Sequence, residues 1–134
     1  MKRETLLWVC IVLLIAAGLR LPHITQPLVD AFSWREASTA MMADNFKPGS
    51  WNIFYPDVSW VGPDPGYQGR ELQLHSYITA LINHAFGWRD WFGRAVSVCF
   101  GLSGVVAFFF LARQTLGPRQ GVFAALMLAL LPGA

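Results

Sequence analysis

Residues 95–112 read AVSVCFGLSGVVAFFFLA and contain no charged side chain. A run of about 18 apolar residues is long enough to cross roughly 30 Å of hydrocarbon as a helix. A similar run, TLLWVCIVLLIAAGL, occupies residues 5–19, and a third begins at Gly121 and is still apolar at Ala134. These runs predict transmembrane helices within residues 1–22, 92–113 and 120–134.

The third run predicts a helix that is cut at Ala134. A transmembrane helix cannot leave its backbone polar groups unpaired in lipid. We therefore expect the chain to be the N-terminal piece of a longer multi-pass protein, and to be inactive as an isolated fragment.

Composition excludes several classes of protein. The chain is 54% hydrophobic and 13% charged, with a mean hydropathy of +0.42. Soluble domains carry roughly 25% charged residues, so an ordinary cytosolic enzyme is excluded. A net charge of +2 is too small to indicate nucleic-acid binding. The two cysteines, Cys10 and Cys99, both lie in apolar runs and form neither a disulfide framework nor a zinc motif.

The first apolar run has a second interpretation as a cleaved signal peptide. Lys2 and Arg3 would form its basic start and residues 16–18 its cleavage zone. Both interpretations place the following segment on the same side of the membrane.

Charges in the short segments predict the orientation. Lys2 and Arg3 precede the first span, and Arg113 and Arg119 flank a predicted link at residues 114–119 that has no acid. The positive-inside rule places both segments in the cytoplasm. Residues 23–91 then form an extracytoplasmic loop, which holds seven of the eight acidic residues.

The loop pattern predicts two amphipathic juxtamembrane helices, at about 33–46 and 71–86. Ser33 and Glu36 form a capping box at the start of the first helix. The face of this helix that carries Trp34 and Phe46 suits the headgroup region of a membrane. Gly87 follows the second helix, which is too short and too polar to span lipid. The expected fold class is therefore an all-α integral membrane protein.

The order of residues in this loop resembles the first outer loop of bacterial polytopic glycosyltransferases of the GT-C fold. These are the relatives of dolichyl-phosphate-mannose–protein mannosyltransferase and aminoarabinose transferase (glycosyltransferase family 39-like). The resemblance covers nearly the whole chain, through Asp30, residues 34–37, 39–43, 45–46, 71–74, Tyr77, 80–81, Gly87, Arg94, 111–113, 116–117 and Pro132.

The resemblance implies the N-terminal part of a GT-C bundle with three transmembrane helices. It implies transfer of a sugar from a polyprenyl-phosphate donor to a protein or lipid acceptor at the outer face of the bacterial inner membrane. Membrane lipid, donor and acceptor are the expected partners, and nucleic acid is not. The family pattern has an adjacent Asp-Glu pair followed by Ala, where this chain reads Arg35-Glu36-Ala37 and lacks the Asp.

Two acids are therefore candidates for the catalytic base. Asp30 stands near the outer end of the first span, where an acceptor would arrive, and its other interpretation is a solvated loop carboxylate. Glu36 matches the second member of the pair, and its other interpretation is the capping box. Asp30 ranks first because it has no capping partner at helical spacing.

Donor binding has three candidates. Arg70 could hold a phosphate as a bidentate donor, and Glu71 stands beside it, where it also suits the first turn of a helix. Arg94 opens the second span, where a cation is either functional or reaches out to the interface. The resemblance implies no certain cofactor; a divalent metal stays possible, but His75 and His84 face opposite ways and do not indicate one.

Two questions stay open at this stage. Trp51, Trp60, Trp88 and Trp91 fit either sugar stacking or an aromatic belt at the membrane interface. The alternative function is a non-enzymatic multi-pass transporter or assembly subunit whose outer loop binds a partner.

The orientation is testable by cysteine labelling in intact spheroplasts. A membrane-impermeant maleimide should label a cysteine at Ser59, because the loop faces outward, and should not label one at Gln114. The reverse pattern would show that the orientation is inverted.

Overall fold

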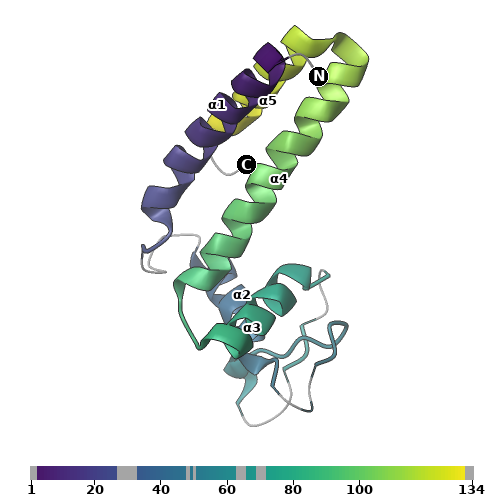
Figure 1. Ribbon diagram of the computed structural model, residues 1–134. Helices are drawn as coiled ribbons and strands as arrows, with labels where there is room; N and C mark the ends of the chain where they lie inside the picture. The colour runs from purple at the N-terminus through teal and green to yellow at the C-terminus, as the bar shows by residue number, and fades with distance from the viewer. Residues whose placement is uncertain are drawn as a thin grey trace. The chain divides into compact units, whose positions relative to one another are not determined.

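The computed structural model describes residues 3–26, 33–47, 49, 51–62, 66–68 and 72–131 (Figure 1). These residues include five α-helices: α1 (Arg3–Arg20), α2 (Ser33–Asn45), α3 (Leu74–Phe86), α4 (Trp91–Leu116) and α5 (Pro118–Leu130). The described part of the chain contains no β-strand beyond one isolated bridge. The expected all-α class is confirmed for the described residues.

The chain forms two compact units. The first unit combines Met1–Ile24 with Ser97–Ala134, and the second unit is Thr25–Val96. Helix α4 contributes its first residues to the second unit and the rest to the first. The division matches the sequence pattern, because the apolar runs supply one unit and the acidic, aromatic loop supplies the other.

The first unit is held together by one small apolar core. Val12 and Ala16 of α1, Val105 and Phe109 of α4, and Ala125 and Ala129 of α5 are all buried there. Helix α5 presents Gly121, Ala125 and Ala129 at four-residue spacing, and all three are buried. Small residues at this spacing allow helix backbones to approach closely, as in membrane helix pairs.

Arg20 ties the end of α1 to the end of α5. Its Nη1 donates to the carbonyl of Ala16, 3.1 Å away in the same helix, and to that of Ala129, 3.1 Å away in α5. Because both acceptors lie near helix C-termini, α1 and α5 run parallel, side by side (Figure 1). The Ala129 carbonyl lies in the last turn of α5, where carbonyls lack helical partners and favour a cation.

The connection between α4 and α5 is tighter than the expected link at residues 114–119. Helix α4 continues to Leu116, α5 begins at Pro118, and Gly117 alone separates them. Gly117 has a φ of +103°, which glycine adopts readily, and Pro118 suits the first position of a helix. The predicted link was too long because its limits were set by the positions of the arginines and not by the Gly117-Pro118 turn.

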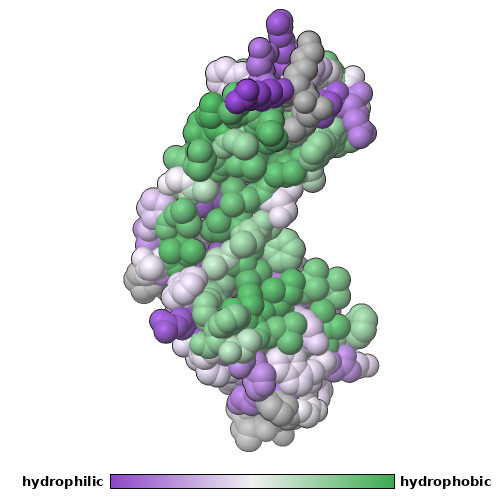
Figure 2. Space-filling model, in the orientation of Figure 1, coloured by the Kyte–Doolittle hydropathy of each residue, from purple (hydrophilic) through white to green (hydrophobic). Residues whose placement is uncertain are grey.

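Two helices are long and apolar enough to cross a membrane: α1 with its 3-10 extension (Arg3–His23) and α4. In the most apolar 18-residue stretch of each helix, only 11% of the first and 22% of α4 is buried. The core helices of a soluble protein are mostly buried. Apolar side chains instead cover the visible face of this unit (Figure 2), with Leu14 72% exposed. A third span is not confirmed, because α5 has 13 described residues, or about 20 Å of helix.

The second unit pairs α2 with α3 over an aromatic core. Ala43, Phe46 and Ala80 are buried, with Trp51 and Tyr77 packed against them. The expected helix at 71–86 begins at Leu74, because Gln73 has a non-helical backbone and its carbonyl accepts the first turn's bond from Tyr77. The expected membrane-facing role of Phe46, which directly follows α2, is wrong, since this ring is 4% exposed and lies in the core.

The segment after α2 is a folded ribbon and not a linker. Asp57 and Tyr67 form an antiparallel bridge, and Val58 donates to the Gly66 carbonyl at 3.0 Å. The side-chain amide of Asn45, the last residue of α2, donates to the Asp57 carbonyl at 3.0 Å. The end of α2 therefore fixes the position of this ribbon.

Because α4 and α5 approach closely, we expect alanine substitutions at two glycines to have different effects on stability. A methyl group on Gly121 would lie 3.1 Å from the backbone of Arg113, whereas one on Gly104 would meet nothing within 4 Å. Gly121→Ala should lower the thermal unfolding midpoint in detergent, by a destabilisation of about 1–3 kcal/mol.

Gly104→Ala is the matched control, because both glycines lie inside helices. It should leave the midpoint unchanged or raise it, since alanine favours a helix by about 1 kcal/mol over glycine. Equal midpoints for the two variants would show that the α4–α5 approach is not this close.

Candidate functional site

Two of the five site residues predicted from sequence belong to the described part of the chain. Glu36 lies in the first turn of α2, and Arg94 lies in the first turn of α4. Asp30, Arg70 and Glu71 lie outside the described residues, as does the Ser33 side chain of the predicted capping box. The site is therefore built from Glu36 and Arg94 and from what holds them.

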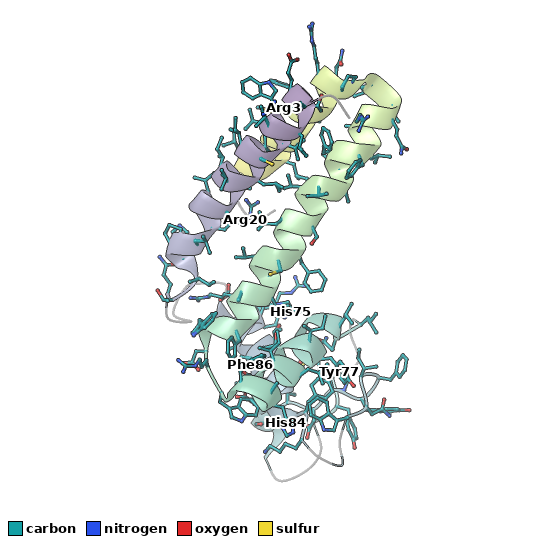
Figure 3. All side chains as sticks on the ribbon, viewed as in Figure 1. Arg3, Arg20, His75, Tyr77, His84 and Phe86 are labelled. Atoms are coloured by element: carbon teal, nitrogen blue, oxygen red, sulfur yellow. The ribbon has the colours of Figure 1, made fainter. Side chains whose placement is uncertain are left out.

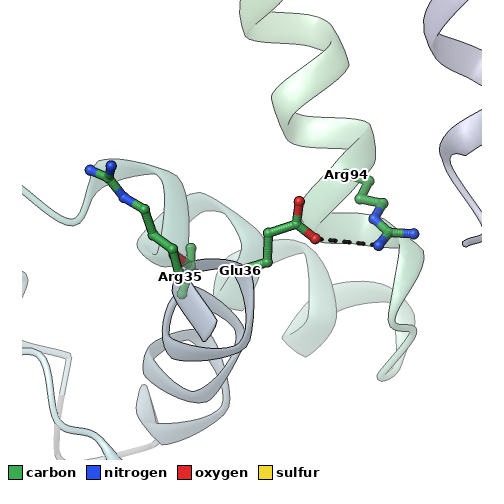
Figure 4. Close-up of polar contacts among 4 residues, drawn as sticks. Arg35, Glu36 and Arg94 are labelled. Carbon is green, nitrogen blue, oxygen red and sulfur yellow. Dashed lines mark hydrogen bonds and ion pairs between the residues drawn. The ribbon is translucent and has the colours of Figure 1, made fainter. Parts of the chain in front are cut away.

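Glu36 and Arg94 form an ion pair. The Arg94 Nη2 lies 3.3 Å from the Glu36 Oε2, although 58 residues separate them in the chain (Figure 4). The Arg94 side chain is 23% exposed and the Glu36 side chain 59% exposed. Arg35, the neighbour of Glu36, points away from this pair (Figure 4).

Helix α3 positions both partners through two consecutive residues. The Ser76 hydroxyl donates to the Thr39 carbonyl of α2 at 3.1 Å. The His75 Nε2 lies 3.0 Å from the Gly93 carbonyl, in the first turn of α4. Because Thr39 and Gly93 are close in sequence to Glu36 and Arg94, α3 sets where the two charged groups meet.

The pair combines two chemical capacities. A guanidinium presents five N–H donors in a planar fork that fits a carboxylate or a phosphate. A carboxylate can accept a proton from a hydroxyl group or hold that hydroxyl in place. With one side chain largely exposed, the ion pair itself contributes no more than about 1 kcal/mol to stability. An anionic ligand can therefore compete with Glu36 for Arg94.

A second acidic group lies further along α2. Burial raises the pKa of the Asp44 carboxyl above its usual 3.8, the charge of Asp90 raises it further, and Lys47 lowers it. Asp44 also lies in the last turn of α2, where the helix dipole disfavours a negative charge. No local sequence pattern singles out Asp44, because Asp90, whose charge acts on it, is 46 positions away in the chain.

The aromatic residues of the loop divide into two groups. Trp51 packs at 6.3 Å from Phe46 and 5.7 Å from Tyr77 between ring centroids, and also contacts His84. It therefore packs against the aromatic core and is only partly exposed. Trp60, Trp88 and Trp91 are 51%, 56% and 39% exposed, so both interpretations remain for them.

The described residues contain no cluster of three or more His, Cys, Asp or Glu side chains that could hold a metal. His75 contacts Gly93, whereas His84 contacts Trp51. Figure 3 labels both on α3, one near its start and one near its end.

No known protein family, curated protein or solved structure matches this chain.

The raised pKa of Asp44 predicts a pH-dependent effect on stability. A folded-state pKa above the unfolded value means that the stabilisation from protonation is complete below pH 3.8 and is lost as the pH rises through the folded pKa. Asp44→Asn, which is neutral at every pH, should therefore raise the unfolding midpoint at neutral pH. The gain should vanish below about pH 3.8.

The effect should be small, on the order of 0.5 kcal/mol, because Asp44 is only partly buried and solvent screens its charge. Asp90→Asn should act in the same direction, since it removes the charge that faces Asp44. A lower midpoint for Asp44→Asn at neutral pH would show that the ionised carboxylate stabilises the fold.

Proposed function

We propose that this chain belongs to a membrane glycosyltransferase, a hexosyltransferase that uses a polyprenyl-phosphate sugar donor. The acceptor is a protein or a lipid at the extracytoplasmic face of the inner membrane. One observation carries the proposal. The acid that the family resemblance marks for chemistry, Glu36, lies 3.3 Å from Arg94, the cation at the start of the second span that is a candidate for donor binding.

The chemistry of the transfer needs both kinds of group. An acceptor hydroxyl attacks the anomeric carbon of the donor sugar, the carbon–oxygen bond to the phosphate breaks, and the hydroxyl proton moves to a base. A carboxylate, Asp30 or Glu36, takes this proton. A guanidinium beside the phosphate stabilises the negative charge that the leaving polyprenyl phosphate gains. We propose that Arg94, together with Arg70 and Glu71, which precede α3 in the sequence, binds the phosphate of the donor.

The apolar helices support the membrane location. Retention of α1 as a membrane anchor is also supported. Val12 and Ala16 form part of the first unit's core, and Arg20 bonds to α5. Cleavage at residues 16–18 would remove Val12 from that core and separate Arg20 from the rest of α1. We propose a cytoplasmic N-terminus and an outward second unit, and that the polyprenyl donor reaches the site from the bilayer.

The activity is testable in membranes that contain the intact protein. Asp30→Asn should reduce the rate of sugar transfer by about 10²–10⁴, the usual contribution of a general base. Glu36→Gln should reduce it less, because glutamine still closes a capping box. Arg94→Gln should act mainly on the donor KM, whereas Arg89→Gln, an exposed arginine five residues earlier, is the matched control and should not.

Three outcomes would change the proposal. Full activity of Asp30→Asn with an inactive, normally expressed Glu36→Gln would identify Glu36 as the base. Equal effects of Arg94→Gln and Arg89→Gln would remove Arg94 from the donor site. If the intact protein transfers no sugar from any polyprenyl-phosphate donor, the glycosyltransferase proposal is wrong and a partner-binding outer loop becomes the better explanation.

A further inference from the structure

The contact between Glu36 and Arg94 is loose for an ion pair. It joins the Nη2 atom of the guanidinium to the Oε2 atom of the carboxylate at 3.3 Å. Charge-assisted bonds between such groups are usually about 2.7–2.9 Å long, and the strongest use two nitrogens and two oxygens. The Glu36 side chain is also 59% exposed, so water can take the place of Arg94 beside it. The pair can therefore open at little cost.

The fold around the pair does not depend on it. The Ser76 hydroxyl donates to the Thr39 carbonyl of α2, and the His75 ring contacts the Gly93 carbonyl of α4. These contacts attach α2 and α4 to α3 through main-chain atoms. Both helices therefore keep their places when the two charged side chains separate.

Separation affects the two partners differently. Both lie in the first turn of a helix, Glu36 in α2 and Arg94 in α4. The positive end of a helix dipole stabilises a carboxylate at this position and destabilises a guanidinium. Glu36 thus keeps a favourable place without its partner, whereas Arg94 needs an anion beside it. Glu36 is most easily released when another anion takes its place.

In the proposed function this second anion is the phosphate of the donor. A guanidinium binds a phosphate through two parallel N–H donors, whereas the contact with Glu36 uses Nη2. The Arg94 side chain is only 23% exposed, which leaves little of it for a second anion beside Glu36. A carboxylate and a phosphate would also repel each other across one cation. Glu36 and a phosphate therefore compete for Arg94.

We infer that Glu36 is an internal competitor of the donor, which occupies Arg94 until the donor phosphate displaces it. The inference rests on the proposed function for the identity of the anion. No covalent bond changes in the exchange, and charge is conserved, because one anion replaces another on the same guanidinium. The displaced carboxylate is then available to the acceptor hydroxyl, as its base or to hold it in place. The donor must therefore bind before the acceptor meets this carboxylate.

The test measures binding of farnesyl phosphate, a short prenyl phosphate without a sugar, to the intact protein in detergent by titration calorimetry. Glu36→Gln keeps the size of the side chain and removes its charge. It should lower the Kd by about three- to five-fold, which corresponds to the loss of one exposed ion pair as a competitor. Arg94→Gln should raise the Kd by about ten-fold or more, because a charge-assisted bond to the phosphate is lost.

Two comparisons separate this exchange from a general effect of charge. Asp44→Asn also removes a negative charge from α2, eight residues or about 12 Å further along the helix. At physiological salt it should change the Kd by less than about two-fold, because charges at this distance are screened. In a protein that already carries Arg94→Gln, the Glu36→Gln change should have no effect, since no cation remains to compete for.

The unfolding midpoint provides a second measurement. Glu36→Gln should leave it nearly unchanged, because main-chain contacts hold α2 and α4. A marked fall would show that the pair supports the fold and does not exchange, which would overturn the inference.

The binding results distinguish failure of the inference from failure of the proposed function. If Arg94→Gln weakens binding but Glu36→Gln leaves the Kd unchanged, the phosphate binds beside an intact pair. The competition is then wrong, while the donor role of Arg94 stands. An equal gain from Glu36→Gln with and without Arg94 would show general repulsion, which also overturns the competition. If Arg94→Gln binds farnesyl phosphate as tightly as the natural chain, the donor role of Arg94 falls together with the inference.

Discussion

Two neighbouring side chains on one helix hold the second unit in its arrangement. Ser76 bonds to a backbone carbonyl of α2, and His75 contacts a backbone carbonyl at the start of α4. Both acceptors are main-chain atoms, so the contacts fix the backbones of the two helices and not only their side chains. The ion pair between Glu36 and Arg94 depends on this arrangement, because a largely exposed pair is too weak to create it.

The two units use different physical means to bring helices together. In the first unit, glycine and alanine at four-residue spacing let α5 approach α1 and α4 so closely that Gly121 has no room for a side chain. Packing of this kind buries few large side chains, Phe109 among them, and leaves many of the others exposed. In the second unit, hydrogen bonds from serine, asparagine and histidine are combined with an aromatic cluster around Phe46.

These two types of packing are consistent with one environment. Many large apolar side chains lie exposed on α1, α4 and α3, while alanines, polar residues and a few large apolar side chains such as Phe109 and Phe46 lie inside. In water such an arrangement would expose the leucines at a large cost in free energy. In a bilayer this cost does not arise.

Sequence alone predicts the parts of this protein that depend on local pattern. The uncharged runs predict α1 and α4, Ser33 and Lys47 mark the limits of α2, and Glu36 and Arg94 stand out as charges at helix starts. Long-range contacts are not encoded by any local spacing. The pairing of Glu36 with Arg94, the packing of Trp51 against Tyr77 and the proximity of Asp44 to Asp90 depend on how α2, α3 and α4 pack. The direction in which α3 faces is also a tertiary result, because its periodic leucines predict a buried side in water and an exposed side in lipid. Only the hydrogen bonds of Ser76 and Asn83 decide between the two.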